Sequence, residues 1–110
     1  MKSKRGEDML SPFGVFLRNL RVIRNETLKE MANKLGVTDS YLSAVELNKR
    51  NIPKKWLVEI SRIYDLNEAQ CKRLNITFDL TAMSNLYDKL NLTHSHKQAL
   101  MLAYIELKYD

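Results

Sequence analysis

Two short helical patterns joined by only two residues constrain this chain more than any other feature of its sequence. Residues 28–35 place apolar side chains at i, i+3, i+4 and i+7, and residues 38–47 carry a second apolar face. Gly36 is a typical helix stop, and Thr38 is a good N-cap for the second helix. So short a connection lets two helices cross steeply, with the second one projecting from the surface. The expected inward residues are Leu28, Met31, Ala32, Leu35, Tyr41, Leu42 and Val45.

The flanking sequence predicts three more helices around this pair. Ser11 and Pro12 form a helix start, and Pro53 begins another helix after a basic loop. Asn67 is the N-cap expected for a helix over residues 68–74. The expected core residues of the first two of these helices are Phe13, Phe16, Leu17, Leu20 and Ile23, and Trp56, Leu57, Ile60, Ile63 and Tyr64.

The remainder of the chain has a weaker pattern. Residues 75–81 are β-branched and aromatic, so they fit a short extended segment or a loop. Helical spacing returns over residues 82–90 and 95–108, and the last helix is apolar on more than one face. We therefore expect an all-α chain, with a five-helix domain over residues 11–75 and a C-terminal helical extension over residues 76–110.

Positive charge is concentrated in the first part of the chain. There are twelve Lys and Arg against seven Asp and Glu up to residue 60, whereas residues 61–110 hold six of each kind. The imbalance favours a polyanion-binding head attached to a neutral body. Residues 1–10, with Lys2, Lys4 and Arg5, are expected to form a flexible basic arm. Such an arm fits a phosphate or minor-groove contact, or a solubilising tail.

Enzyme chemistry, a cofactor and a membrane segment find little support in the sequence. His94 and His96 would point to opposite sides of a helix with no acid or Cys beside them, so no metal site is expected. There is no glycine-rich phosphate loop and no catalytic-triad spacing. No stretch is apolar enough for a signal peptide or a membrane span, and the single Cys71 fits an ordinary thiol in a reducing cytoplasm. We expect a cytoplasmic protein that is not an enzyme and needs no cofactor.

The run from residue 28 to residue 53 resembles the lambda-repressor-like, or XRE-type, helix-turn-helix family of phage repressors, Cro-type proteins and bacterial regulators. The usual form of that family is close to LA..LGVS.SYLS.IE.GKR.P, and the similarity extends less sharply from residue 13 to residue 66. The matching residues are Met31, Ala32, Leu35, Gly36, Val37, Thr38, Tyr41, Leu42, Ser43, Glu46, Lys49, Arg50 and Pro53. The resemblance implies a five-helix lambda-repressor-like domain that binds double-stranded DNA. It further implies a dimeric transcriptional repressor from a phage, prophage or mobile element.

By this resemblance, the second helix of the pair would lie in the major groove and read base edges. Its outward residues are small or acidic where many members carry Gln, Arg or Asn, so sequence readout is expected to be modest. Asp39 fits an acceptor for a cytosine amino group, and it equally fits a first-turn acid that favours the helix dipole. Ala44 would contact a thymine methyl. The expected base-reading residues are Thr38, Asp39, Ser40, Ser43 and Ala44.

Phosphate contacts are expected from the loop after this reading helix and from the start of the next helix, where basic side chains, amides and a helix N-terminus meet. The expected phosphate-binding residues are Asn48, Lys49, Arg50, Asn51, Lys54 and Lys55. Leu28 stands where many members have a phosphate-binding Gln, so that contact is missing. The resemblance also implies a buried structural ion pair between Arg21 and Glu46.

The C-terminal helices admit three interpretations. Pairing with a second copy, which we favour, would place two reading helices on half-sites about one turn of DNA apart. Alternatively, these helices would bind a protein partner, as in antitoxins and phage-encoded inhibitors with this type of domain, and DNA binding would be autoregulatory. A third interpretation is that they cap the domain core. The surface expected to serve the first or second role comprises Leu86, Leu90, Leu100, Ala103, Ile105 and Leu107.

Overall fold

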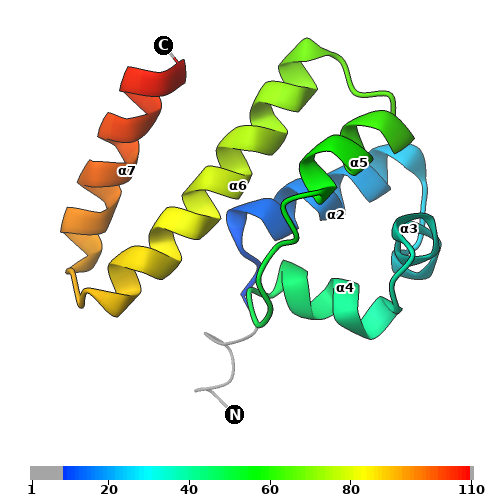
Figure 1. Cartoon of the computed structure of the whole chain (residues 1–110), viewed down its shortest axis with the longest axis horizontal. Helices are drawn as coiled ribbons and strands as arrows, with labels where there is room; N and C mark the ends of the chain where they lie inside the picture. Colours follow the sequence, from blue (N-terminus) through cyan, green and yellow to red (C-terminus); the bar gives the residue numbers. More distant parts are fainter. Residues whose placement is uncertain (1–8, 110) are drawn as a thin grey trace.

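The computed structural model describes residues 9–109, most of which lie in helices (Figure 1). The helices of this part of the chain are α2 (Pro12–Arg24), α3 (Leu28–Leu35), α4 (Asp39–Glu46), α5 (Trp56–Ile63), α6 (Glu68–Lys89) and α7 (His94–Tyr109). No strand occurs within residues 9–109, so the expected all-α class is confirmed. The expected basic arm, residues 1–10, lies outside the described residues except for Met9 and Leu10.

Polar caps explain where four of these helices begin. The side chains of Ser11, Thr27, Thr38 and Asn67 each accept a backbone N–H from the first turn of α2, α3, α4 and α6, respectively. At the other end of α3, Gly36 has a φ of 72°. Glycine adopts this left-handed conformation without steric cost, so the chain can turn directly into α4.

The start of α5 differs from its predicted position. Pro53 was expected to begin this helix, but the regular helix begins at Trp56. The N–H groups of Trp56 and Leu57 donate to the carbonyls of Pro53 and Lys54, at 3.0 and 3.2 Å. These i to i+3 bonds wind the chain more tightly than an α-helix, so residues 53–55 form a turn that leads into α5.

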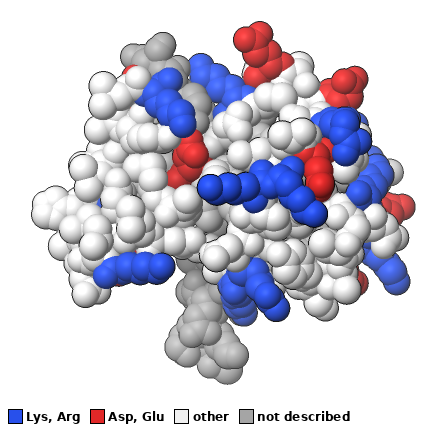
Figure 2. Space-filling view, viewed as in Figure 1, with Lys and Arg blue, Asp and Glu red and all other residues white. Residues whose placement is uncertain are grey.

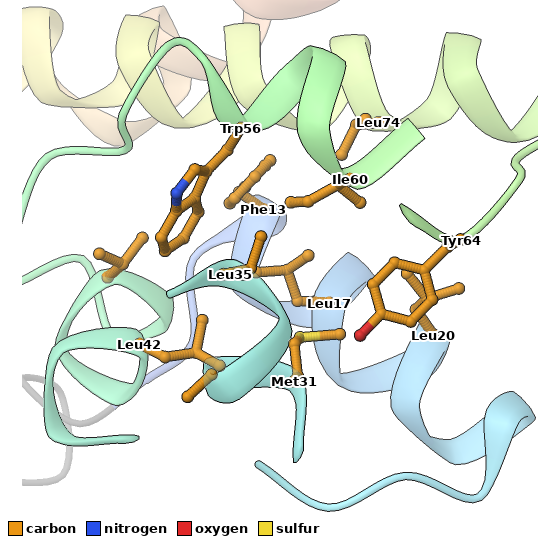
Figure 3. Packing of buried hydrophobic residues seen from close by; sticks show 12 residues of the cluster. Phe13, Leu17, Leu20, Met31, Leu35, Leu42, Trp56, Ile60, Tyr64 and Leu74 are labelled. Carbon is orange, nitrogen blue, oxygen red and sulfur yellow. The ribbon is translucent and has the colours of Figure 1, made fainter. Parts of the chain in front are cut away.

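One apolar core joins α2 to α6, as Figure 3 shows for its largest side chains. Trp56 is fully buried and its ring meets the Tyr41 ring edge to face, with centroids 6.2 Å apart. Burying each such large side chain contributes about 1.5–3 kcal/mol to folding. The buried core residues are Phe13, Leu17, Leu20, Met31, Ala32, Leu35, Leu42, Val45, Trp56, Ile60, Tyr64 and Leu74.

The prediction that Ile23 lies in the core was wrong, because 72% of its surface is exposed. The inward face of α2 runs through Leu17 and Leu20, and in its third turn Arg21 takes the buried position instead. Ile23 lies to one side of that face and lines a small depression with Val15. Because Arg21 is buried, the inward face of α2 differs in this turn from the face that the apolar residues alone predict.

The prediction of an extended segment or loop at residues 75–81 was also wrong, because α6 is helical without a break from Glu68 to Lys89. Two consecutive residues of this segment contact different helices. The Phe78 ring meets the Phe13 ring of α2 edge to face, with centroids 6.2 Å apart, while Asp79 accepts a 3.0 Å hydrogen bond from the Tyr104 hydroxyl of α7. Tertiary packing therefore outweighs the β-propensity of these residues.

The position of α6 between α7 and the remaining helices is visible in Figure 1. Its inner side packs on α2 and α5, and its outer side packs on α7. The buried Thr81 hydroxyl accepts the backbone N–H of Phe13 at 3.2 Å and donates to the Thr77 carbonyl at 2.9 Å. This hydroxyl satisfies a donor in the first turn of α2, so it fixes α6 against the start of that helix. None of the helices within residues 9–109 is both long and apolar enough to cross a membrane.

A polar cluster around Tyr64 closes the end of the domain opposite the α6 C-terminus. The Tyr64 hydroxyl donates to Glu26, and Lys34 forms an ion pair with the same carboxylate. Burial by itself would raise the pKa of Glu26, but hydrogen bonds from Lys34 and Tyr64 and the nearby positive charges outweigh it and hold that pKa below its usual range. Burial, helped by Glu26, raises the pKa of Tyr64. The cluster therefore holds a neutral phenol on an ionised carboxylate.

Gly14 marks the closest approach of α2 to the end of α4, and its substitution tests this packing. A Cβ at this position would lie 2.3 Å from the Glu46 carbonyl oxygen, so the backbone of α4 would have to move. We expect Gly14→Ala to destabilise the protein by at least about 2 kcal/mol, because the overpacking outweighs a helix-propensity gain of about 1 kcal/mol. Thermal unfolding followed by circular dichroism measures the effect.

The control for this variant is Asn19→Ala, on an exposed position of the same helix. It should leave the melting temperature unchanged or slightly raised, because alanine has the higher helix propensity. Equal melting temperatures for the Gly14→Ala and wild-type proteins would contradict the close approach.

Candidate nucleic-acid interface

One side of α4 is open to solvent around a shallow depression of about 380 Å³. Its lining brings together four of the five predicted base-reading residues, Asp39, Ser40, Ser43 and Ala44. Asp39 and Ser40 are exposed and the other two are half-buried. The fifth, Thr38, is also exposed, but its hydroxyl accepts the Tyr41 N–H at 3.0 Å and so caps the helix.

Lys49 links this depression to the basic loop that follows α4. It lines the depression beside Ser43 and Ala44, and it also lines a second one of about 530 Å³ on the other side of the loop. The second depression includes Arg50 and Asn51 and is bounded by Tyr41. Four of the predicted base-reading residues and part of the predicted phosphate-binding loop thus line two depressions that share Lys49.

Arg50 is held in place by an aromatic ring. Its guanidinium lies 5.4 Å from the centroid of the Tyr41 ring, whose edge-to-face contact with Trp56 connects it to the core. An arginine stacked in this way retains its hydrogen-bond donors for another acceptor. The structure therefore presents the charge of Arg50 beside α4 at a low cost in side-chain entropy.

Asn48 begins the loop in a left-handed conformation, with a φ of 62°. Its side-chain amide forms a reciprocal pair with that of Asn85 in α6, with N···O distances of 2.8 and 3.1 Å. Asparagine is among the few residues other than glycine that adopt this backbone conformation readily. The loop is therefore fixed by α6, and Asn48, a predicted phosphate-binding residue, already uses its amide within the protein.

Lys54 and Lys55 are exposed and lie at the turn that precedes α5. Lys54 lines a third depression, of about 420 Å³, together with Asn48 and Asn51. The face of the molecule that Figure 2 shows has Lys and Arg side chains over the part that holds α3 to α5, whereas the part that covers α7 is mostly white.

Sequence reasoning did not identify the three α6 residues that line the second depression. Asn85, Asp88 and Lys89 border the loop, although they lie more than thirty positions away in the chain. The loop or extended segment expected at residues 75–81 concealed this proximity, because it left the direction of the following helix undefined. The absence of Gly and Pro from residues 68–89 was the signal for one continuous helix.

Arg21 and Glu46 form a buried ion pair between α2 and α4, and 7% and 2% of their respective surfaces are exposed. One guanidinium nitrogen donates to each carboxylate oxygen, Nη2 to Oε1 at 3.1 Å and Nη1 to Oε2. Nη1 also contacts the Met31 sulfur at 3.3 Å. The Glu46 carbonyl in turn accepts the backbone N–H of Ser11 at 2.9 Å. Glu46 is thus attached to α2 at two points, which sets the direction of α4.

Most of the predicted self-association or partner surface is exposed. The exposed fractions are 53% for Leu86, 59% for Leu90, 45% for Leu100 and 88% for Leu107. Ala103 is exposed as well, whereas Ile105 is half-buried. Leu102, which the sequence analysis omitted, is 61% exposed. The exposed histidines His94 and His96 lie at the start of α7, and within residues 9–109 no group of three or more His, Cys, Asp or Glu could hold a metal ion.

Removal of Arg21 tests the attachment of α4. Arg21→Ala leaves the buried Glu46 carboxylate without its partner, so we expect a loss of about 3–5 kcal/mol in the free energy of unfolding, measured with urea. The double variant Arg21→Met/Glu46→Leu removes both charges and should recover most of that loss. Equal destabilisation of the single and double variants would show that the unpaired charge is not the cause.

Comparison with known proteins identifies the domain type. The family model described as "Helix-turn-helix domain" matches residues 14–75, more than half of the chain. No curated protein and no solved structure matches the chain significantly. The matched range contains α3, the turn at Gly36, α4 and the basic loop, which together are the motif that the lambda-repressor-like resemblance rests on. The chain therefore belongs to the helix-turn-helix family of DNA-binding domains.

Proposed function

We propose that this protein is a transcriptional regulator that binds double-stranded DNA through the exposed side of α4. The observation that carries the proposal is that Lys49 lines two depressions, one with Asp39, Ser40 and Ser43 and the other with the second basic residue Arg50. A helix with one open side and a flanking basic loop fits the major groove, because the helix reaches base edges while the loop binds phosphates.

The chemistry of α4 supports modest sequence readout. Asp39 offers a carboxylate to a cytosine amino group, and the hydroxyls of Ser40 and Ser43 accept or donate to either kind of base edge. Ala44 supplies a methyl contact for thymine. None of these side chains can form the bidentate hydrogen bonds of Arg, Gln or Asn, so much of the affinity comes from the loop and from the lysines before α5.

Two copies of such a head would compensate for weak readout. Leu100, Ala103 and Leu107 lie at i, i+3 and i+7 on α7 and form an exposed apolar stripe. We propose that this stripe pairs two chains, which would place two α4 helices on a palindromic operator. Bound in this way across a promoter, the protein would act as a repressor, the role that the lambda-repressor-like resemblance implies together with an origin in a phage or mobile element.

The salt dependence of binding tests the phosphate contacts. We compare the wild type with Lys49→Ala/Lys54→Ala/Lys55→Ala on DNA from the region upstream of its own gene, by footprinting and by titration at several salt concentrations. The variant should bind more weakly, and the slope of log K against log salt should fall by about 0.9 for each lost phosphate contact. Arg50 is left unchanged because its stacking on Tyr41 links it to the fold.

The matched control removes the same number of charges elsewhere, in Arg62→Ala/Lys72→Ala/Arg73→Ala, all at exposed positions. This control should keep nearly the wild-type affinity and slope. If both triple variants lose affinity equally, the effect is one of net charge and the assigned loop is wrong. A uniform, salt-sensitive coating of all DNA by the wild type would contradict a specific operator.

The role of α7 is tested by charge insertion. Leu100→Glu/Leu107→Glu places two carboxylates on the proposed dimer stripe, so we expect a monomer in sedimentation and loss of cooperative protection of two half-sites. Leu102→Glu is the control, because Leu102 is also exposed but lies about 200° around the helix from Leu100. A wild type that is already monomeric would contradict the dimer. In that case the stripe would suit a different protein partner, as in an antitoxin or a phage-encoded inhibitor.

A further inference from the structure

The last turns of α6 lie beside the basic loop, beyond the range of the matched family domain, which ends at residue 75. Lys89 is exposed and lines two of the depressions there, one with Lys49 and Arg50 and the other with Lys54. Among residues 61–110, Lys89 is the basic residue that lines these depressions. Its position therefore adds to the charge of the surface proposed to bind DNA.

The geometry between α6 and the loop is defined by the paired amides of Asn48 and Asn85. Asn85 and Lys89 are four residues apart, so they project from the same side of the helix about one turn apart. The amide pair thus sets the direction of Lys89 relative to the loop. A phosphate approaching Asn51 or Lys54 would also approach the Lys89 ammonium.

Asp88 is the acidic residue that lines the same depression, and its charge would oppose a phosphate there. Lys97 of α7 forms an ion pair with the Asp88 carboxylate. An exposed pair of this kind adds little to stability, but it neutralises the acid within a Debye length of the loop. The first turn of α7 therefore removes the main electrostatic obstacle to phosphate at this end of α6.

We propose that the C-terminal end of α6 is part of the DNA interface, with Lys89 binding a backbone phosphate beside the basic loop and Lys97 masking the charge of Asp88. This inference rests on the DNA-binding function proposed above. It adds a contact from outside the helix-turn-helix domain, on the side of the loop away from α4. The ligand is the phosphodiester backbone, so the contact adds affinity without sequence preference.

The test compares Lys89→Ala with Lys72→Ala in the full-length protein. Both substitutions remove one exposed lysine from α6, and the two positions are about 25 Å apart along the helix. Lys89→Ala should weaken binding several-fold and lower the salt slope by about one unit, with the same preferred sequence, whereas Lys72→Ala should change neither. Loss of the favourable interaction between Lys89 and the helix dipole would change the melting temperature but not the salt slope.

A double-mutant cycle tests the masking of Asp88. Lys97→Ala should weaken binding in the wild-type background and have a smaller effect in the Asp88→Asn background, where no acid needs masking. Equal losses in both backgrounds would overturn the role given to Lys97.

The α6 contact and the proposed function can be contradicted separately. If the wild type binds DNA and Lys89→Ala matches Lys72→Ala in affinity and slope, the α6 contact is wrong and the proposed function stands. If the wild type binds no DNA at any salt concentration, both are wrong.

Discussion

The direction of α4 depends on Glu46. Its carboxylate is paired with Arg21 in the last turn of α2, and its carbonyl accepts a hydrogen bond from the backbone N–H of Ser11 at the start of the same helix. A single residue at the end of α4 thus fixes that helix at two points along another. The buried charge is tolerable because each carboxylate oxygen has a guanidinium donor, and because Gly14 lets the two backbones approach.

Local signals were sufficient to predict α2, α3 and α4. Ser11 and Thr38 cap α2 and α4, as predicted, and Gly36 ends α3, whose apolar spacing was the signal for that helix. Such features act over a few residues, so they can be recognised in a single sequence. The prediction was less accurate where a distant contact determined the outcome. Arg21 is buried because Glu46 is opposite it, and this contact leaves Ile23 in solvent.

The difference between local signals and distant contacts also separates the predicted from the missed residues of the candidate interface. The residues of α4 and its loop could be chosen from their order in the chain, and most of them line at least one of the three depressions. Asn85 and Lys89 could not be chosen in that way, because their place beside the loop requires a straight α6. That helix is maintained by side chains packed on α2 at one side and on α7 at the other, information that local propensity does not contain.

The left-handed residue at position 48 has a consequence for transplanting this motif. The usual form of the family has glycine there, which reaches the conformation by backbone freedom alone. This chain has asparagine, which has less backbone freedom than glycine but forms a side-chain hydrogen bond with Asn85. Residues 28–53 grafted onto another scaffold would carry the motif but would lack the hydrogen bonds with Asn85. A faithful graft of α3, α4 and the following loop therefore includes α6, or restores glycine at the first position of the loop.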